Sequence, residues 1–137
     1  MQVKEICEEN WIGLVDKGLP YQCNELNQVK DAIKRLDGVE KTMLILSVDD
    51  DVYMTIAGGN NGRYICEITN EREDSMFALL STSKNPVSKV AIVAGKQEGL
   101  YDSSLCLSLN EVFEASEFFC IYGKKNPNQC WKNTYES

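Results

Sequence analysis

Hydrophobic periodicity changes twice along this chain of 137 residues, and these changes limit its fold more than any other feature. Leu26, Val29, Ile33 and Leu36 follow one another at steps of three, four and three, which places them on one face of a helix. Asn24 stands where an N-cap is expected, and a glycine two residues after Leu36 supplies a stop. The pattern predicts a first helix between about residues 24 and 38.

From residue 42 onward, apolar residues form short β-prone runs separated by polar turns. The four clearest runs are Met43 to Val48, Val52 to Ala57, Arg63 to Thr69 and Met76 to Leu80. The turns between them are rich in aspartate, glycine and asparagine, which are typical of tight connections between antiparallel strands. We therefore expect an antiparallel meander, to which residues 2 to 7 add an edge strand, Val87 to Ala94 a fifth strand and Ser104 to Leu107 a short pairing segment.

A second helix is predicted to begin after Ser108, because Ser108 and Glu111 have the spacing of a capping box. Apolar side chains then recur on one face until Gly123, which ends the helix. Two helices that bracket a run of sequential strands predict a single α+β domain over residues 1–137. Its antiparallel sheet has about five or six strands, both helices pack on one face, and the other face stays free.

The negative charge of the chain lies in its first half. The formal net charge is −7; residues 1 to 74 hold 15 acidic against 8 basic side chains, and residues 75 to 137 hold 6 against 6. Such a surface disfavours nucleic acid and anionic membranes and favours fast, salt-sensitive encounter with a basic partner. The simpler alternative is that the charge serves solubility alone.

The residue types that most catalytic and metal sites need are scarce. The chain has no histidine, which excludes imidazole acid–base catalysis, imidazole-dependent triads and histidine-ligated metals. Six cysteines lack the two-residue spacing of zinc or redox motifs, and those in apolar runs, such as Cys66 and Cys120, are typical of buried thiols in a reducing compartment. The glycine-rich segment 58–62 precedes a strand and so lacks the helix N-terminus of a phosphate loop. We therefore expect no enzymatic activity, no cofactor and no metal.

The N-terminal residues and the apolar runs bear on location. Acidic residues interrupt the first nine positions before a signal-peptide core could form, and the longest uncharged apolar runs have the length of strands. The expectation is a soluble, cytoplasmic protein.

One pattern in the C-terminal half resembles a known family. A strand ends in Gly95-Lys96-Gln97-Glu98-Gly99, and an amphipathic helix later closes with Phe118-Phe119 and Gly123, followed by Pro127 and Trp131. This resembles immunity protein family one of bacterial polymorphic toxin and contact-dependent growth inhibition systems. The resemblance covers most of the chain, and its sharp motifs lie between residues 95 and 131. The cysteines and the acidic turn from Glu71 to Asp74 depart from the family pattern.

The resemblance implies a function in bacterial competition. Proteins of this kind bind the C-terminal domain of a cognate secreted toxin, often a nuclease or nucleic-acid deaminase, in the cytoplasm. The resemblance therefore implies that this chain forms a one-to-one complex with a basic toxin domain. The complex would neutralise the toxin by covering its active site or its substrate surface. Gly95, Glu98, Phe119 and Trp131 are the motif residues, and the structural interpretation is favoured for Gly95 and Trp131.

The candidate toxin-binding residues come from charge. They are Asp49, Asp50, Asp51, Glu71, Glu73 and Asp74 in two acidic turns, together with Glu98. The three adjacent acids from Asp49 to Asp51 could instead be merely solvated, as is usual in a turn. Two other functions stay open: a small acidic adaptor with a non-toxin partner, and an enzyme that works through paired carboxylates, whose separation no sequence reveals.

Overall fold

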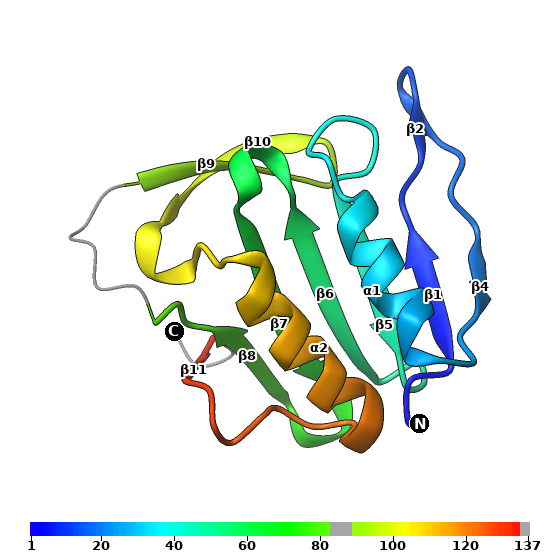
Figure 1. The fold of residues 1–137 in the computed structure, drawn as a ribbon, viewed down its shortest axis with the longest axis vertical. Coiled ribbons are helices and arrows are strands. Elements are labelled where there is room, and N and C mark those ends of the chain that lie inside the picture. Colours follow the sequence, from blue (N-terminus) through cyan, green and yellow to red (C-terminus); the bar gives the residue numbers. More distant parts are fainter. Residues whose placement is uncertain (83–88, 135–137) are drawn as a thin grey trace.

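The computed structural model describes residues 1–82 and 89–134 (Figure 1). Two helices are present in these segments, α1 (Leu26–Arg35) and α2 (Leu109–Tyr122). The strands are β1 (Glu5–Glu8), β2 (Trp11–Ile12), β3 (Val15–Asp16), β4 (Pro20–Gln22), β5 (Met43–Ser47), β6 (Val52–Gly58), β7 (Tyr64–Asn70), β8 (Ser75–Leu79), β9 (Lys89–Ala94), β10 (Gln97–Asp102) and β11 (Trp131–Asn133). Short 3-10 turns lie at Asn60–Gly62, Glu71–Glu73 and Ser103–Leu105.

The main sheet is antiparallel and has seven strands in the order β11-β8-β7-β6-β5-β1-β4. Its centre, β5 to β8, is the predicted meander. Alternate residues of these strands face the helices, and their side chains form the core, as Leu46, Met54 and Ile68 do in one cross-strand row. The prediction of an α+β domain is confirmed. The predicted number of strands, about five or six, was too low, because β4 and β11 are only three residues long and were not recognised.

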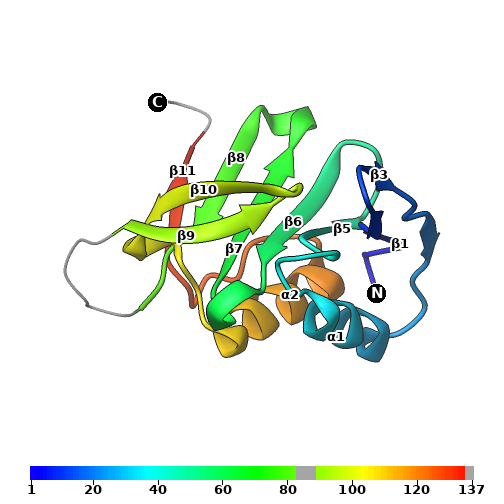
Figure 2. The same ribbon diagram turned by 90° about the horizontal axis from the view of Figure 1, so that it is seen from above.

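Both helices cover the same face of the sheet, as predicted (Figures 1 and 2). The predicted capping box starts α2, since Ser108 Oγ accepts a hydrogen bond from the Glu111 N–H at 3.3 Å and a Glu111 carboxylate oxygen accepts one from the Ser108 N–H at 3.0 Å. Gly123 ends α2 in the left-handed conformation, with φ of 69°. For α1 the predicted N-cap was wrong by one residue: Glu25 is the cap, because the Gln28 side chain reaches back to the backbone of residues 24 and 25.

The opposite face of the sheet is not wholly free, which corrects the prediction. β9 pairs with β10 instead of joining the main sheet, and this hairpin crosses the face away from the helices (Figure 2). The first two residues of the predicted fifth strand, 87 and 88, lie outside the described residues. Ile92 is fully buried beneath the hairpin, against Gly58. A Cβ at Gly58 would lie 2.6 Å from the Arg63 carbonyl oxygen and 3.2 Å from Ile92, and its φ of 106° also requires glycine.

Three polar groups attach the β9–β10 turn to the start of β5. Thr42 Oγ1 donates a hydrogen bond to the buried Glu9 carboxylate and accepts one from the Lys96 N–H at 2.9 Å. Lys96 Nζ lies 5.4 Å from the centroid of the Trp11 ring, which adds a cation–π contact. The turn of this hairpin is therefore fixed to the end of the sheet where β5 begins.

The N-terminal segment is more regular than predicted. β1 is an internal strand, because it pairs with β5 on one side and with β4 on the other. Between β1 and α1, for which no strand was predicted, the chain forms the small β2–β3 hairpin and the edge strand β4. The predicted pairing segment at residues 104–107 makes one antiparallel bridge, between Leu107 and Tyr64.

Neither helix in the described segments combines the length and the apolar composition that crossing a bilayer requires.

Glu8, Tyr21 and Arg35 link three elements by polar contacts. Arg35 of α1 donates two hydrogen bonds to the Glu8 carboxylate of β1, at 2.8 and 2.9 Å, and Tyr21 of β4 donates a third. Burial raises the pKa of Glu8, but hydrogen bonds from Arg35 and Tyr21 outweigh it and hold this pKa below its ordinary value. Burial and the neighbouring Glu8 carboxylate raise the pKa of Tyr21 to about 12. The cluster therefore depends on an ionised Glu8.

We expect Glu8→Gln to lower the free energy of unfolding by about 1–2 kcal/mol at neutral pH, because a neutral amide forms weaker bonds to Arg35. The pKa of Glu8 is lower in the folded state, so its contribution is present above the unfolded-state pKa of about 4.3 and is lost as pH falls through the folded-state value. Urea unfolding of both proteins at several pH values measures this. The exposed Glu114→Gln is the control. A difference of equal size in acid and at neutral pH would contradict the prediction.

Candidate functional site

The two acidic turns predicted as binding elements lie side by side at one end of the sheet. One joins β5 to β6 and the other joins β7 to β8, and in an antiparallel meander these two connections lie at the same end (Figure 1). The contact is direct, because the Glu71 N–H donates a hydrogen bond to the Asp51 carbonyl oxygen at 2.8 Å. We call residues 49–51 and 71–74 the acidic end.

Arg72 connects the two turns. Its Nη2 lies 2.9 Å from Asp49 Oδ2, and its Nη1 lies 3.3 Å from Asp51 Oδ2. The other oxygen of Asp49 accepts hydrogen bonds from the N–H groups of Asp51 and Val52. The hydrogen bond from Arg72 holds the pKa of Asp49 below its ordinary value, and the same contact raises the pKa of Arg72. Asp49 and Asp51 therefore maintain the turns themselves.

The remaining four carboxylates face solvent. Asp50, Glu71, Glu73 and Asp74 are exposed, and their side chains make no hydrogen bond or ion pair with any residue that the structure describes. Six carboxylates against the single Arg72 guanidinium leave five excess negative charges at the acidic end. This concentration of unpaired charge is available to a cationic partner.

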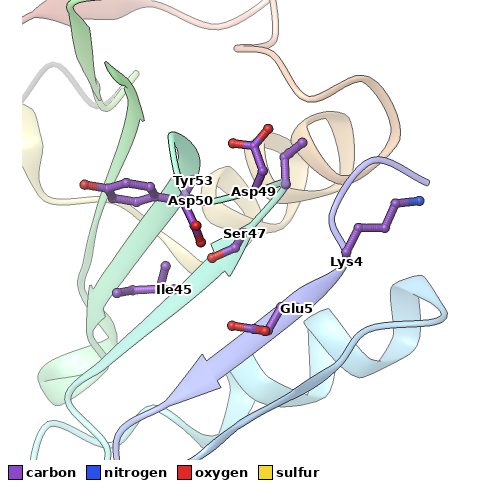
Figure 3. A pocket seen from close by; sticks show the side chains of 8 residues that line it. Lys4, Glu5, Ile45, Ser47, Asp49, Asp50 and Tyr53 are labelled. Atoms are coloured by element: carbon purple, nitrogen blue, oxygen red, sulfur yellow. The ribbon is translucent and has the colours of Figure 1, made fainter. Parts of the chain in front are cut away.

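A shallow hollow of about 340 Å³ opens beside the acidic end, on the sheet face away from the helices (Figure 3). Residues of three neighbouring strands and the β5–β6 turn line it: Lys4, Glu5, Ile45, Ser47, Val48, Asp49, Asp50 and Tyr53. Glu5, Ser47 and Tyr53 share one cross-strand row, which explains why they meet there. The hollow thus combines carboxylates with an aromatic ring and short polar groups.

A second hollow, of about 420 Å³, lies on the other side of Tyr53. Its lining comes from Tyr53 and the β7–β8 hairpin, namely Thr69, Asn70, Glu71, Asp74, Ser75 and Met76. Tyr53 therefore separates two hollows, each with acidic side chains at its rim. This arrangement suits cationic side chains, because a carboxylate attracts the charge and an aromatic face accepts it.

Glu98 is remote from this surface. It lies exposed on β10, in the hairpin whose turn is attached to the start of β5, whereas the acidic end follows the last residue of β5. Gly95 has a φ of 58° and lies between β9 and β10, so the strand expected to end within residues 95–99 ends at Ala94 and a further strand, β10, follows. The structure does not bring Glu98 together with the other six candidates.

The two aromatic motif residues have structural positions. Phe119 is fully buried in the core on α2. Trp131 is half-buried at the start of β11, and its indole N–H donates a hydrogen bond to the Asn126 carbonyl oxygen at 3.0 Å. Docking of this tryptophan was expected, but the strand that carries it was not predicted.

Tyr53, Glu5 and the role of Arg72 were not predicted from the sequence. Strict alternation would have assigned Tyr53 to the face away from the core, since Val52, Met54 and Ile56 face inward. Glu5 could not be placed beside Tyr53, because that requires the pairing of β1 with β5, whose strands lie far apart in sequence. For Arg72, the only signal was a lone cation among acids.

Other reactive groups lie in places that favour structural roles. Burial raises the pKa of the Cys66 thiol, and it raises that of Cys120 to about 12, while both side chains lie in the core. Within residues 1–82 and 89–134, no three His, Cys, Asp or Glu side chains are grouped so that they could hold a metal ion. Burial also raises the pKa of Glu67, which lines a pocket of about 110 Å³ under the β9–β10 hairpin with no second carboxylate among the described lining residues.

No protein-family model matches this chain, and no curated protein matches it either.

Proposed function

We propose that this chain is an immunity-type inhibitor that uses its acidic end to bind and neutralise a basic toxin domain. The observation that carries the proposal is the convergence of two acidic turns, distant in sequence, into one surface with four unpaired carboxylates. The resemblance of residues 95–131 to immunity protein family one supplies the biological setting. The compartment we propose is the bacterial cytoplasm.

The shape of the surface supports binding to a protein. The acidic end lies at the strand ends of the sheet, and each of the two hollows beside Tyr53 has room for one long cationic side chain. Arginine and lysine are the residues that a nuclease or nucleic-acid deaminase uses to hold phosphates. Occupation of those cations by carboxylates would block the substrate surface of the toxin.

The distribution of charge also favours binding over catalysis. A general acid needs a carboxyl whose pKa is raised and which stands near a second functional group. Glu67 meets the first condition but has no carboxylate beside it in its pocket, and at the hollow lined by Asp49 the pKa of that carboxyl is lowered. We therefore propose that the chain acts by binding alone.

The first experiment is co-expression with the toxin domain encoded beside its gene. Immunity predicts rescue of growth and an equimolar complex that survives purification at low salt and dissociates as salt rises, because opposite charges are screened. Rescue by unrelated acidic proteins of equal charge would contradict specific recognition. A stable complex with another basic protein, without any rescue, would favour the adaptor.

Neutralising the four unpaired carboxylates should weaken this complex. The variant carries Asp50→Asn, Glu71→Gln, Glu73→Gln and Asp74→Asn. At ~0.5 kcal/mol per exposed ion pair, we expect it to lose about 2 kcal/mol of binding free energy, which corresponds to roughly thirtyfold weaker affinity. The loss should fall mainly on the association rate and shrink at high salt. Surface plasmon resonance at several salt concentrations measures both effects.

A matched control removes four charges elsewhere. The control variant carries Asp31→Asn, Glu40→Gln, Glu114→Gln and Glu117→Gln, at exposed residues that lie outside the acidic end. This control should retain most of the affinity. Equal losses in the two variants would show that overall charge, and not the acidic end, determines binding.

Replacing Arg72 tests the electrostatics in the opposite direction. Arg72→Gln removes the single cation of the acidic end and releases Asp49 and Asp51, so toxin association should become a few-fold faster at low salt. The free energy of unfolding should change little, since the ion pairs are exposed and screened by solvent. Stopped-flow association and thermal unfolding measure the two quantities. Slower association with unchanged stability would instead show that Arg72 itself contacts the toxin.

A further inference from the structure

Among the described residues, strand β10 is longer than the two outer strands of the main sheet and pairs on one side only, with β9. β4 contains a proline and has three residues, β11 also has three, and β2 and β3 have two each. Folded proteins normally shorten, interrupt or cover an edge strand, because its free N–H and C=O groups can pair with another chain. β10 has six residues and no proline, and no other described strand pairs with its outer edge, so the charges of Glu98 and Asp102 are its only protection.

The hairpin's other edge, on β9, is already occupied. The Asn60 side-chain amide donates to the Ala91 carbonyl oxygen at 3.0 Å and accepts from the Val93 N–H at 3.2 Å, as a neighbouring strand would. Because the N–H and C=O of one residue in an antiparallel strand point to the same side, residues 91 and 93 face away from β10. Their partners across the hairpin are Leu100 and Glu98, whose backbone groups must then point away from β9.

Those groups have no partner among the described residues. Neither the N–H nor the C=O of Glu98 or Leu100 is in a hydrogen bond, and the Leu100 side chain is 68% exposed. Four backbone groups on one open edge, beside an exposed leucine, are suited to strand addition.

We propose that a second copy of this chain pairs with β10 in an antiparallel, two-fold arrangement centred on Gly99. Glu98 of each copy then lies opposite Leu100 of the other, which gives four backbone hydrogen bonds and extends two hairpins into one four-stranded sheet. The pairing ends there, since the next N–H along the edge, that of Lys96, already donates to Thr42.

Charge selects this register over its neighbours. A two-fold axis at position 98 would place the Glu98 carboxylates opposite each other, and an axis at Leu100 would place Glu98 opposite Asp102. Like charges directly opposite are destabilising in a sheet. An axis at Gly99 avoids both conflicts and brings the two Leu100 side chains near one another across the axis.

The dimer is expected to be weak and to respond to salt in the opposite sense to toxin binding. The pairing surface is small, and each chain carries a net charge of −7, so the two copies repel one another. Added salt screens this repulsion and should strengthen the dimer, whereas it weakens the toxin complex. Failure of one proposal is therefore distinguishable from failure of the other.

Sedimentation equilibrium of the full chain at low and high salt tests the proposal with two variants. Leu100→Pro removes an outward N–H without breaking a bond to β9, and should give a monomer at every concentration. Leu100→Lys places a cation opposite Glu98 of the other copy and should tighten the dimer several-fold. If only side-chain burial held two copies together, Leu100→Lys would weaken them, which would overturn the register.

Amide hydrogen exchange on the unmodified chain covers the case in which Leu100→Pro fails to fold. The N–H groups of Glu98 and Leu100 should become protected as protein concentration rises, while those of Gln97 and Gly99, already bonded within the hairpin, should not change. A chain that stays monomeric at high concentration and high salt would overturn self-pairing. If Leu100→Pro then weakened the toxin complex, the edge would belong to the toxin.

Discussion

Antiparallel pairing of β5, β6, β7 and β8 is the constraint from which the rest of this molecule follows. It places one set of alternate side chains against the helices and the other set on the opposite face. It also brings the first and third turns of the meander to one end of the sheet, which is why residues 49–51 and 71–74 meet. The acidic end is therefore a consequence of strand order, and the core that holds this order lies on the helix-covered face of the sheet.

The acidic end concentrates charge that the fold does not need. Repulsion among six carboxylates is offset by Arg72 only at Asp49 and Asp51, and full exposure to water limits the cost at the other four. The half-buried carboxylate of the Glu8 cluster, by contrast, has three hydrogen bonds. The concentration of four unpaired carboxylates on one small surface is the physical reason for proposing a binding role for the acidic end.

Hydrophobic periodicity and capping residues predicted those helices and strands whose formation depends on nearby residues in the sequence. The four meander strands and both helices have clear periods, and Ser108, Glu111 and Gly123 mark the ends of α2 as expected. β4 and β11 were not predicted because they are only three residues long, and β10 was not predicted because its sequence, with Gly99 in the middle, does not alternate. Each becomes a strand only through its pairing with another strand. β9 looked like a member of the sheet because a sequence run does not say which strand it joins.

For the candidate site, the sequence identified the two acidic turns but not their joint surface. The carboxylates were visible as runs, whereas Tyr53 and Glu5 enter the site only through the pairing of β1 with β5 and β5 with β6. Glu98 was added to the turns as an acidic residue of the family motif, and the fold separates it from them. Composition therefore finds charged residues, and topology decides which of them act together.

The same topology explains how such a surface could be changed without loss of the fold. Each acidic turn is held by the strands on either side, and its exposed side chains contribute little to the core. Substitutions at Asp50, Glu71, Glu73 or Asp74 would therefore alter partner choice at small cost in stability, whereas Tyr53 and Arg72 have contacts on two sides that limit what can replace them. A binding surface built on turns of a rigid meander can thus diverge with its partner, and this separation of core from contact residues is what an inhibitor matched to one toxin requires.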